Sequence, residues 1–145
     1  ITQRKGDAVA PLIEKFAEDE TSILLGTMTL WQGVDVPGKS CTLVAIDRIP
    51  FPRPDEPVMS ARAAEADIAG GSGFMQVSLP RAALLLAQGT GRLIRSTEDR
   101  GVVAILDSRI VTKRYGNILL NSMPPFWRTS DGKIIRESLR RLAGK

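Results

Sequence analysis

Three side chains of the stretch QGTGRLIR could together bind a phosphate group. On a helix that turns about 100° per residue, Gln88, Arg92 and Arg95 lie within about 60° of one another. A guanidinium group is permanently charged, and its planar fork donates paired hydrogen bonds to phosphate oxygens. The spacing therefore predicts a rigid polar face that suits a polyphosphate delivered from outside the helix.

Two glycines interrupt the same predicted helix. Gly89 and Gly91 each cost about 1 kcal/mol relative to alanine in a helix interior. We interpret them as positions where another backbone or a ligand comes close, because glycine has no side chain. The alternative is a solvated face on an ordinary surface helix, which gives no reason for the glycines or for Gln88.

A second group of candidate ligand-binding residues follows the apolar run SILLG at 22–26. Thr27 and Thr29 carry hydroxyls that can donate to a phosphate oxygen. Gly33 would let a ligand approach the backbone, and Asp35 can accept from a hydroxyl or orient an arginine. Each of these residues taken alone is more often an ordinary loop residue, so the interpretation rests on the group.

Residue types that are absent or rare exclude several kinds of site. The chain has no histidine, and Cys41 is its single cysteine. Within these residues this excludes an internal disulfide, a Cys/His metal cluster, a complete four-cysteine iron–sulfur cluster and His-based catalysis. Any chemistry must come from Arg, Asp, Gln and backbone groups, and Cys41 is expected to be a small core residue.

Charge and hydropathy indicate the class of partner. The chain has 145 residues, with 20 Lys and Arg against 16 Asp and Glu, and its net charge of +4 is a weak preference for polyanions. No apolar run approaches the roughly 20 residues needed to cross a bilayer, and the first residues lack the profile of a signal peptide. We expect one domain in a reducing cytoplasm, with no membrane partner.

Short apolar runs alternate with helical patterns, which predicts an α/β fold with a parallel sheet. Buried strands are predicted at 22–26, 42–47 and 101–107. Helices are predicted at 7–19 with Asp7 as its cap, at 58–68, from Pro80 through QGTGRLIR, at 113–122 and at 131–142. Four prolines within 49–57 predict an extended strap, and GGSG at 70–73 predicts a flexible joint.

These motifs and their order resemble the bacterial DinG helicases, which are relatives of the XPD group in superfamily two. The likeness runs from Asp7 to Phe126 and rests on WQGVDVPG at 31–38, PFPRPDEP at 50–57, QGTGRLIR at 88–95 and ILDSRIVTKRYG at 105–116. Within it, Gln88-x-x-Gly91-Arg92-x-x-Arg95 is similar to the last motif of the superfamily, and Thr27 to Asp35 is similar to its Thr-to-Gly-x-Asp motif. Gln32 departs from the pattern, because DinG-like proteins have glutamate there.

The resemblance implies a second RecA-like helicase lobe, a parallel sheet flanked by helices, formed by residues 1–145 of a longer chain. It leaves open whether the strand that usually opens this lobe is present. ATP and Mg²⁺ would be bound mainly by a first lobe, because this sequence has neither a Gly-x-Gly-Lys-Ser/Thr loop nor an acidic pair for magnesium. We therefore expect no metal site and no activity in these residues alone.

The resemblance also implies a role for each candidate residue and a set of partners. Arg92 and Arg95 would act as arginine fingers and Gln88 as a contact to the γ-phosphate, while Gly33 and Asp35 would also contact the nucleotide and Thr27 and Thr29 the backbone of single-stranded DNA. The partners would be single-stranded DNA and the first RecA-like lobe of the same chain, in the nucleoid of a bacterium. DNA rather than RNA follows only from the resemblance. A noncatalytic nucleic-acid-binding module is the alternative.

Two further hypotheses concern residues outside these motifs. Asp107 and Arg109 follow the third predicted strand and either pair with each other or steady Arg92. Trp31 and Trp127 are expected to pack in the core or in an interface rather than to stack on bases.

Overall fold

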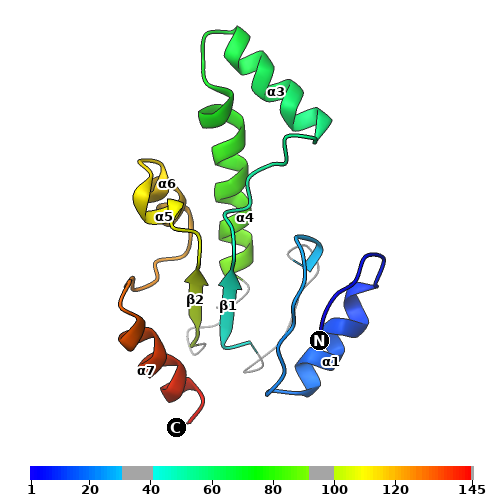
Figure 1. Cartoon of the computed structure of the whole chain (residues 1–145), viewed down its shortest axis with the longest axis vertical. Helices are drawn as coiled ribbons and strands as arrows, with labels where there is room; N and C mark the ends of the chain where they lie inside the picture. The colour runs from blue at the N-terminus through cyan, green and yellow to red at the C-terminus, as the bar shows by residue number, and fades with distance from the viewer. Residues whose placement is uncertain (31–40, 92–99, 145) are drawn as a thin grey trace. The chain divides into compact units, whose positions relative to one another are not determined.

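The computed structural model describes residues 1–30, 41–91 and 100–144 (Figure 1). Its elements follow in the order α1 (Val9–Glu18), β1 (Leu43–Ile46), α3 (Pro57–Ile68), the π-helix η2 (Phe74–Ser78), α4 (Leu79–Gly91), β2 (Val102–Ile105), α5 (Arg109–Thr112), α6 (Gly116–Ser122) and α7 (Gly132–Leu142). The chain divides into two compact units. The first contains Ile1–Ala45, Gly89–Ala104 and Phe126–Lys145, and the second contains Ile46–Gln88 and Ile105–Pro125.

Strands β1 and β2 pair in parallel, as Figure 1 shows by the common direction of their arrows. The backbone N–H of Val102 donates to the carbonyl of Thr42 at 2.9 Å, and that of Leu106 donates to Ile46 at 2.9 Å. A connection that contains α3 and α4 joins the two strands in sequence, as a parallel pair requires. The predicted α/β class with a parallel sheet is confirmed.

The strands are less buried than predicted. Every residue of β2 is only half-buried, and Leu43 at the start of β1 is 43% exposed. In the part of the chain that the structure describes, the sheet contains just these two strands, so each has a single neighbour. The prediction of strands buried throughout is therefore wrong here, because full burial needs covering elements on both faces.

The segment predicted as a buried strand at 22–26 is extended but exposed. It pairs in parallel with the first three residues of the chain, through Ile1 N to the Ile23 carbonyl at 2.8 Å, Leu25 N to the Ile1 carbonyl at 2.9 Å and Gln3 N to the Leu25 carbonyl at 2.8 Å. The side chains of Ile23 and Leu25 are 70% and 58% exposed. Helix α1 connects the two paired segments, a crossover that the sequence did not predict because residues 1–3 carry no strand pattern.

Two helix boundaries differ from the prediction. Helix α1 begins after Ala8 without a side-chain cap, because the carboxylate of Asp7 accepts from the backbone N–H of Arg4 at 2.7 Å instead. The helix predicted at 113–122 begins only at Gly116, as α6, because Lys113 has extended dihedral angles, and the short helix α5 before it was not predicted.

The helices predicted at 58–68 and 131–142 are confirmed. Asp131 caps α7, where its carboxylate accepts from Lys133 N at 2.8 Å. Helix α3 begins at Pro57, which is typical of the first helical position.

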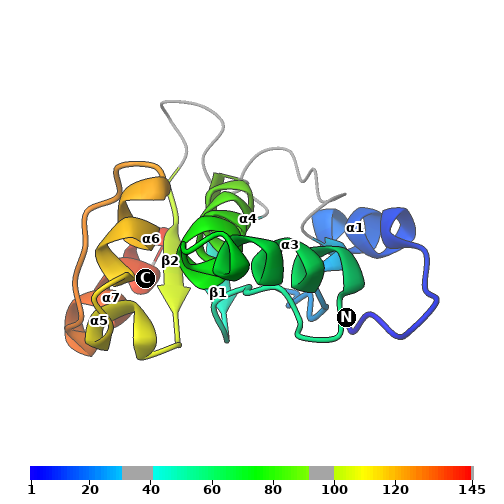
Figure 2. The same ribbon diagram turned by 90° about the horizontal axis from the view of Figure 1, so that it is seen from above.

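The expected flexible joint at 70–73 is a defined turn that ends α3 (Figure 2). Gly70 has a φ of +82°, Gly71 N donates to the Ala66 carbonyl at 2.9 Å, and Gly70 N donates to the Asp67 carbonyl at 3.1 Å. This is the Schellman arrangement, which satisfies carbonyls at a helix end. The Asp67 carboxylate also accepts from Gly73 N at 2.7 Å. Glycine at these positions therefore builds a structured cap rather than a joint.

The helix expected to begin at Pro80 starts earlier, with the π-helix η2. Proline has no N–H and would clash with the carbonyl four residues before it in a regular helix. The N–H of Leu79 instead donates to Phe74, five residues earlier. The wider turn accommodates Pro80, and η2 and α4 form one continuous helical segment.

The core of the second unit is built around α4. Its buried apolar side chains are Ile46, Ile49, Leu79, Ala82, Leu85, Leu86, Ile110 and Leu119. The hydroxyl of Ser122 on α6 donates to the Ala83 carbonyl on α4 at 3.2 Å. This packing holds α4 up to Gln88, the first residue of the candidate phosphate-binding face.

Candidate functional site

Thr27 and Thr29, the two candidate phosphate contacts, lie together in the structure. Both are exposed, and their hydroxyl oxygens are 3.1 Å apart. The side-chain amide of Gln3 joins them: its Nε2 donates to Thr29 Oγ1 at 2.7 Å, and its Oε1 accepts from Thr27 N at 3.2 Å. The hydroxyls are thus held by a residue that sequence reasoning missed, because one glutamine near the start of a chain carries no signal.

Gln88 is the one member of the predicted phosphate-binding face within the described residues. It is exposed near the end of α4, beside the buried residues Gly89 and Thr90. Arg92 and Arg95 lie outside the described residues, as do Gly33, Asp35, Gln32 and Trp31. The exposed amide and its buried neighbours agree with a polar face anchored from behind, and the placement of the two arginines stays a prediction.

No packing contact among the described residues explains why position 91 is glycine. A Cβ atom added there would meet nothing within 4 Å. The helix therefore accepts alanine at this position without a clash, although glycine lowers its stability. The interpretation that Gly91 leaves room for something outside this chain stays a prediction.

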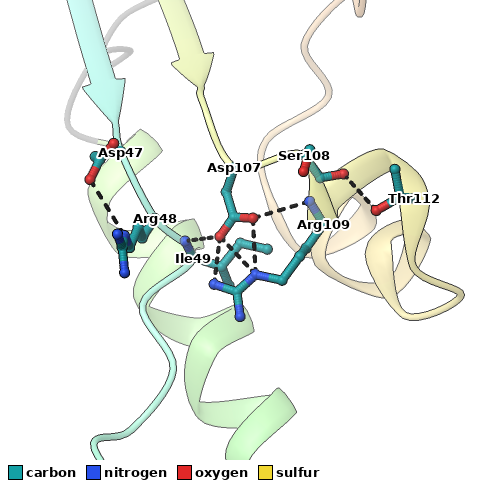
Figure 3. Close-up of polar contacts among 7 residues, drawn as sticks. All are labelled: Asp47, Arg48, Ile49, Asp107, Ser108, Arg109 and Thr112. Atoms are coloured by element: carbon teal, nitrogen blue, oxygen red, sulfur yellow. Dashed lines mark hydrogen bonds and ion pairs between the residues drawn. The ribbon is translucent and has the colours of Figure 1, made fainter.

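Asp107 links the exits of both strands (Figure 3). Its carboxylate accepts from Ile49 N just after β1 at 3.0 Å, and from Arg109 N at 3.0 Å. The Arg109 side chain adds bonds from Nε at 2.9 Å and from its terminal nitrogen at 2.6 Å. Asp107 and Arg109 therefore pair with each other, which confirms one of the two hypotheses about them. The other, that they steady Arg92, concerns a residue outside the described part of the chain.

Burial makes this pair stronger than the surface pairs around it. The Asp107 side chain is only 8% exposed, and that of Arg109 is 41% exposed. Hydrogen bonds from the Arg109 side chain hold the pKa of Asp107 well below its usual range, aided by the N–H groups of Ile49 and Arg109 and opposed by burial. The same pairing raises the pKa of Arg109. Asp107 is consequently a carboxylate at neutral pH.

Replacing Asp107 by asparagine is expected to lower the free energy of unfolding by about 2 kcal/mol at pH 7, since charge-assisted hydrogen bonds to Arg109 are lost. Because the folded pKa of Asp107 is lowered, its contribution is present above about pH 4 and lost as the pH falls below that value. The difference between wild type and variant should therefore shrink between about pH 5 and pH 2. Urea unfolding across this range measures it.

Asp47→Asn is the matched control for this prediction. Asp47 also follows β1 but is 87% exposed, and its oxygen lies 3.7 Å from Arg48 (Figure 3). Such surface pairs contribute little, so the variant should match wild type at every pH. Equal losses in the two variants would contradict the role assigned to Asp107.

An aromatic cluster anchors the proline-rich strap, which has no helix or strand before Pro57. The ring of Phe51 lies 5.4 Å from that of Phe74 and 5.8 Å from that of Tyr115, centroid to centroid. The Arg109 guanidinium lies 5.4 Å from the Phe51 centroid, within cation–π range. Together with the bond from Ile49 to Asp107, these contacts hold the start of the strap beside the exit of β2.

Other predicted residues have simpler surroundings. Trp127 is 74% exposed, so a place in the core is wrong for it, although an interface stays a prediction. Cys41 is only half-buried rather than a core residue. No group of three or more His, Cys, Asp or Glu side chains that could hold a metal ion occurs within residues 1–30, 41–91 and 100–144. Across those same ranges, the helices are too short or too polar to span a membrane.

Residues 1–126 match the family described as "Helicase C-terminal domain". The chain belongs to this family. Its RecA-like α/β class, with a small parallel sheet and helices, agrees with that membership. The match covers both polar motifs and the strap, and it extends past α6.

Named relatives of this helicase domain agree with the resemblance to DinG. The chain is 58% identical over 137 residues to "ATP-dependent helicase DinG" of Mycobacterium tuberculosis (strain H37Rv), covering 94% of this chain and 21% of that protein. It is 44% identical over 126 residues to "ATP-dependent DNA helicase YoaA" of Haemophilus influenzae, covering 86% of this chain and 20% of that protein. It is also 44% identical over 119 residues to "3'-5' exonuclease DinG" of Bacillus subtilis, covering 82% of this chain and 13% of that protein. The chain thus spans at most about a fifth of the length of these relatives, and its resemblance to the DinG group is confirmed.

Proposed function

We propose that this chain is the second motor lobe of an ATP-dependent DNA helicase, that residues 1–145 form this lobe, and that it works with a first RecA-like lobe. The observation that carries the proposal is the 58% identity to an ATP-dependent DinG helicase over 94% of the chain. On this proposal the working enzyme is cytoplasmic and associates with the bacterial nucleoid.

The lobe's contribution to ATP hydrolysis would come from the end of α4. ATP and Mg²⁺ would be held mainly by the first lobe, and Arg92 and Arg95 would reach the γ-phosphate when the lobes close. Two guanidinium groups and an amide have the donor chemistry that phosphate oxygens require. The exposed side chain of Gln88, on a helix whose neighbouring residues are buried, supports this use of the helix end. Asp35 and Gly33 would contact the nucleotide.

Contact with single-stranded DNA would come from the hydroxyls of Thr27 and Thr29. Their exposure and their separation of 3.1 Å support a shared phosphate ligand. Contacts to the backbone carry no sequence information, so we expect little sequence preference and strong salt dependence. Closing of the lobes around ATP and opening after hydrolysis would shift this lobe along the strand.

Hydrolysis of ATP by the full-length protein, with and without single-stranded DNA, tests the proposal. We expect single-stranded DNA to stimulate ATP hydrolysis. Added salt should weaken DNA binding and so raise the DNA concentration needed for half-maximal stimulation. The noncatalytic binding module predicts DNA binding without hydrolysis. DNA binding without ATP hydrolysis would therefore favour the noncatalytic binding module over the helicase proposal.

Gly91→Ala separates the effect of this glycine on the stability of α4 from its proposed effect on ATP hydrolysis. Alanine should stabilise the helix by up to about 1 kcal/mol, because its Cβ meets nothing within 4 Å. If another lobe or a ligand approaches here, the same variant should lower DNA-stimulated ATP hydrolysis about tenfold or more, since misplacement by about 1 Å costs up to 10²-fold. Thermal unfolding and turnover measured on one preparation check both effects. A more stable variant with unchanged turnover would refute the close-approach interpretation.

A further inference from the structure

The side chain of Gln3 spans the two threonines proposed to contact DNA. Its Nε2 lies 2.7 Å from Thr29 Oγ1, and its Oε1 lies 3.2 Å from Thr27 N and 3.5 Å from Thr27 Oγ1. Its Oε1 also lies 3.0 Å from Thr29 Oγ1. One amide therefore contacts both threonine hydroxyls and the backbone N–H of Thr27.

The backbone and a neighbouring glycine fix the position of this amide. Gln3 N donates to the Leu25 carbonyl at 2.8 Å, which holds the residue beside the segment that leads into Thr27. A Cβ atom on Gly26 would lie 2.9 Å from Gln3 Oε1 and closer still to the side chain of Leu30. Glycine at position 26 thus leaves the space that the amide occupies. Gln3 is half-buried, whereas both threonines are exposed.

The direction of the shortest bond has a consequence for ligand binding. A threonine hydroxyl has one hydrogen to donate and two lone pairs that accept. Gln3 Nε2 donates to Thr29 Oγ1, and the Thr29 hydroxyl in turn donates to Gln3 Oε1 at 3.0 Å. The amide therefore fixes the position of the hydroxyl, and a bound phosphate oxygen would replace Oε1 as the acceptor of its hydrogen. Without the amide, each hydroxyl would rotate and donate to whichever acceptor is nearest, and ordering it would reduce affinity.

We propose that Gln3 is a positioning residue that orients the hydroxyls of Thr27 and Thr29 toward one backbone phosphate of single-stranded DNA. The inference rests on the proposed function, because that function supplies the ligand. Gln3 acts through the two threonines and does not touch the nucleotide that is hydrolysed.

DNA-stimulated ATP hydrolysis by the full-length protein tests the inference, with a single-stranded oligothymidylate as the probe. Gln3→Ala should raise the half-saturating DNA concentration about tenfold, which is the size of one lost oriented hydrogen bond. Turnover at saturating DNA should stay within about twofold of wild type, since the phosphoryl site is unchanged. A general loss of folding would instead lower turnover and the midpoint of thermal unfolding together.

Three variants make the test specific. Gln3→Met keeps the length of the side chain but removes the amide. It should raise the half-saturating DNA concentration as much as Gln3→Ala does, and it avoids the shorter side chain that could disturb folding. Adding Gln3→Ala to a variant that already carries Thr27→Val and Thr29→Val should not weaken DNA binding further, because Gln3 acts through these two hydroxyls. Thr2→Ala changes the exposed neighbour of Gln3 and should match wild type.

Each remaining outcome overturns one identifiable claim. DNA affinity unchanged in Gln3→Ala and Gln3→Met, or a further loss when Gln3→Ala is added to the variant without both threonine hydroxyls, would overturn the positioning role. If the wild-type protein shows no DNA-stimulated hydrolysis, the proposed function fails instead. If DNA stimulates the wild type and Arg95→Ala lowers turnover while the Gln3 variants behave like wild type, only the inference about Gln3 fails.

Discussion

Arg95→Ala is expected to lower DNA-stimulated ATP hydrolysis by the full-length protein by about 10³-fold, while ATP still binds. An arginine that stabilises the charge on a transferring phosphoryl group contributes about 10³ to 10⁵ in rate elsewhere. Its charge matters mainly in the transition state, so turnover should fall far more than affinity for ATP. Turnover at saturating ATP and DNA, together with direct ATP binding, measures both quantities.

Arg62→Ala is the matched control, because Arg62 is an exposed arginine on α3. It removes the same charge from the chain and should leave turnover unchanged. Arg95→Lys adds a second comparison: lysine keeps the charge but loses the planar fork, so it should recover only part of the rate. Unchanged hydrolysis in Arg95→Ala would mean that the glycine and arginine face serves another partner, and the binding module would become the better proposal.

Gly116→Ala is expected to lower the free energy of unfolding by about 3 kcal/mol, in the upper part of the range for overpacked sites. Gly116 is buried at the start of α6, and an added Cβ would overlap the backbone carbonyl of Ile110. Ile110 is itself 7% exposed in the core of the second unit, so its carbonyl cannot move without disturbing the packing around Leu119. Urea unfolding at neutral pH gives the free energy directly.

A second glycine provides the comparison for this variant. Gly132→Ala places a Cβ 3.4 Å from the end of the Arg136 side chain, an exposed group that can move aside. This substitution lies in the first turn of α7 and should be neutral or slightly stabilising. A Gly116→Ala protein as stable as wild type would show that α5 and α6 can separate at this point.

The amino-acid sequence by itself determined the family and much of the order of elements. Helix α7, helix α3 and the irregular proline-rich strap all follow from local patterns. Each depends on residues a few positions apart: a capping side chain, a proline at the first helical position, a cluster of prolines. The resemblance to DinG helicases rests on short motifs of the same local kind and is confirmed.

Only the tertiary structure decided which distant residues meet. Gln3 reaches Thr29 across 26 positions, and Asp107 bonds to Ile49 across 58. The break between α5 and α6 depends on the approach of Gly116 to Ile110, and the exposure of the strand segments depends on what covers them. Hydropathy periods and capping patterns report the conformation of neighbouring residues. They hold no record of which separated segments pack together, because that choice is made by the free energy of the whole fold.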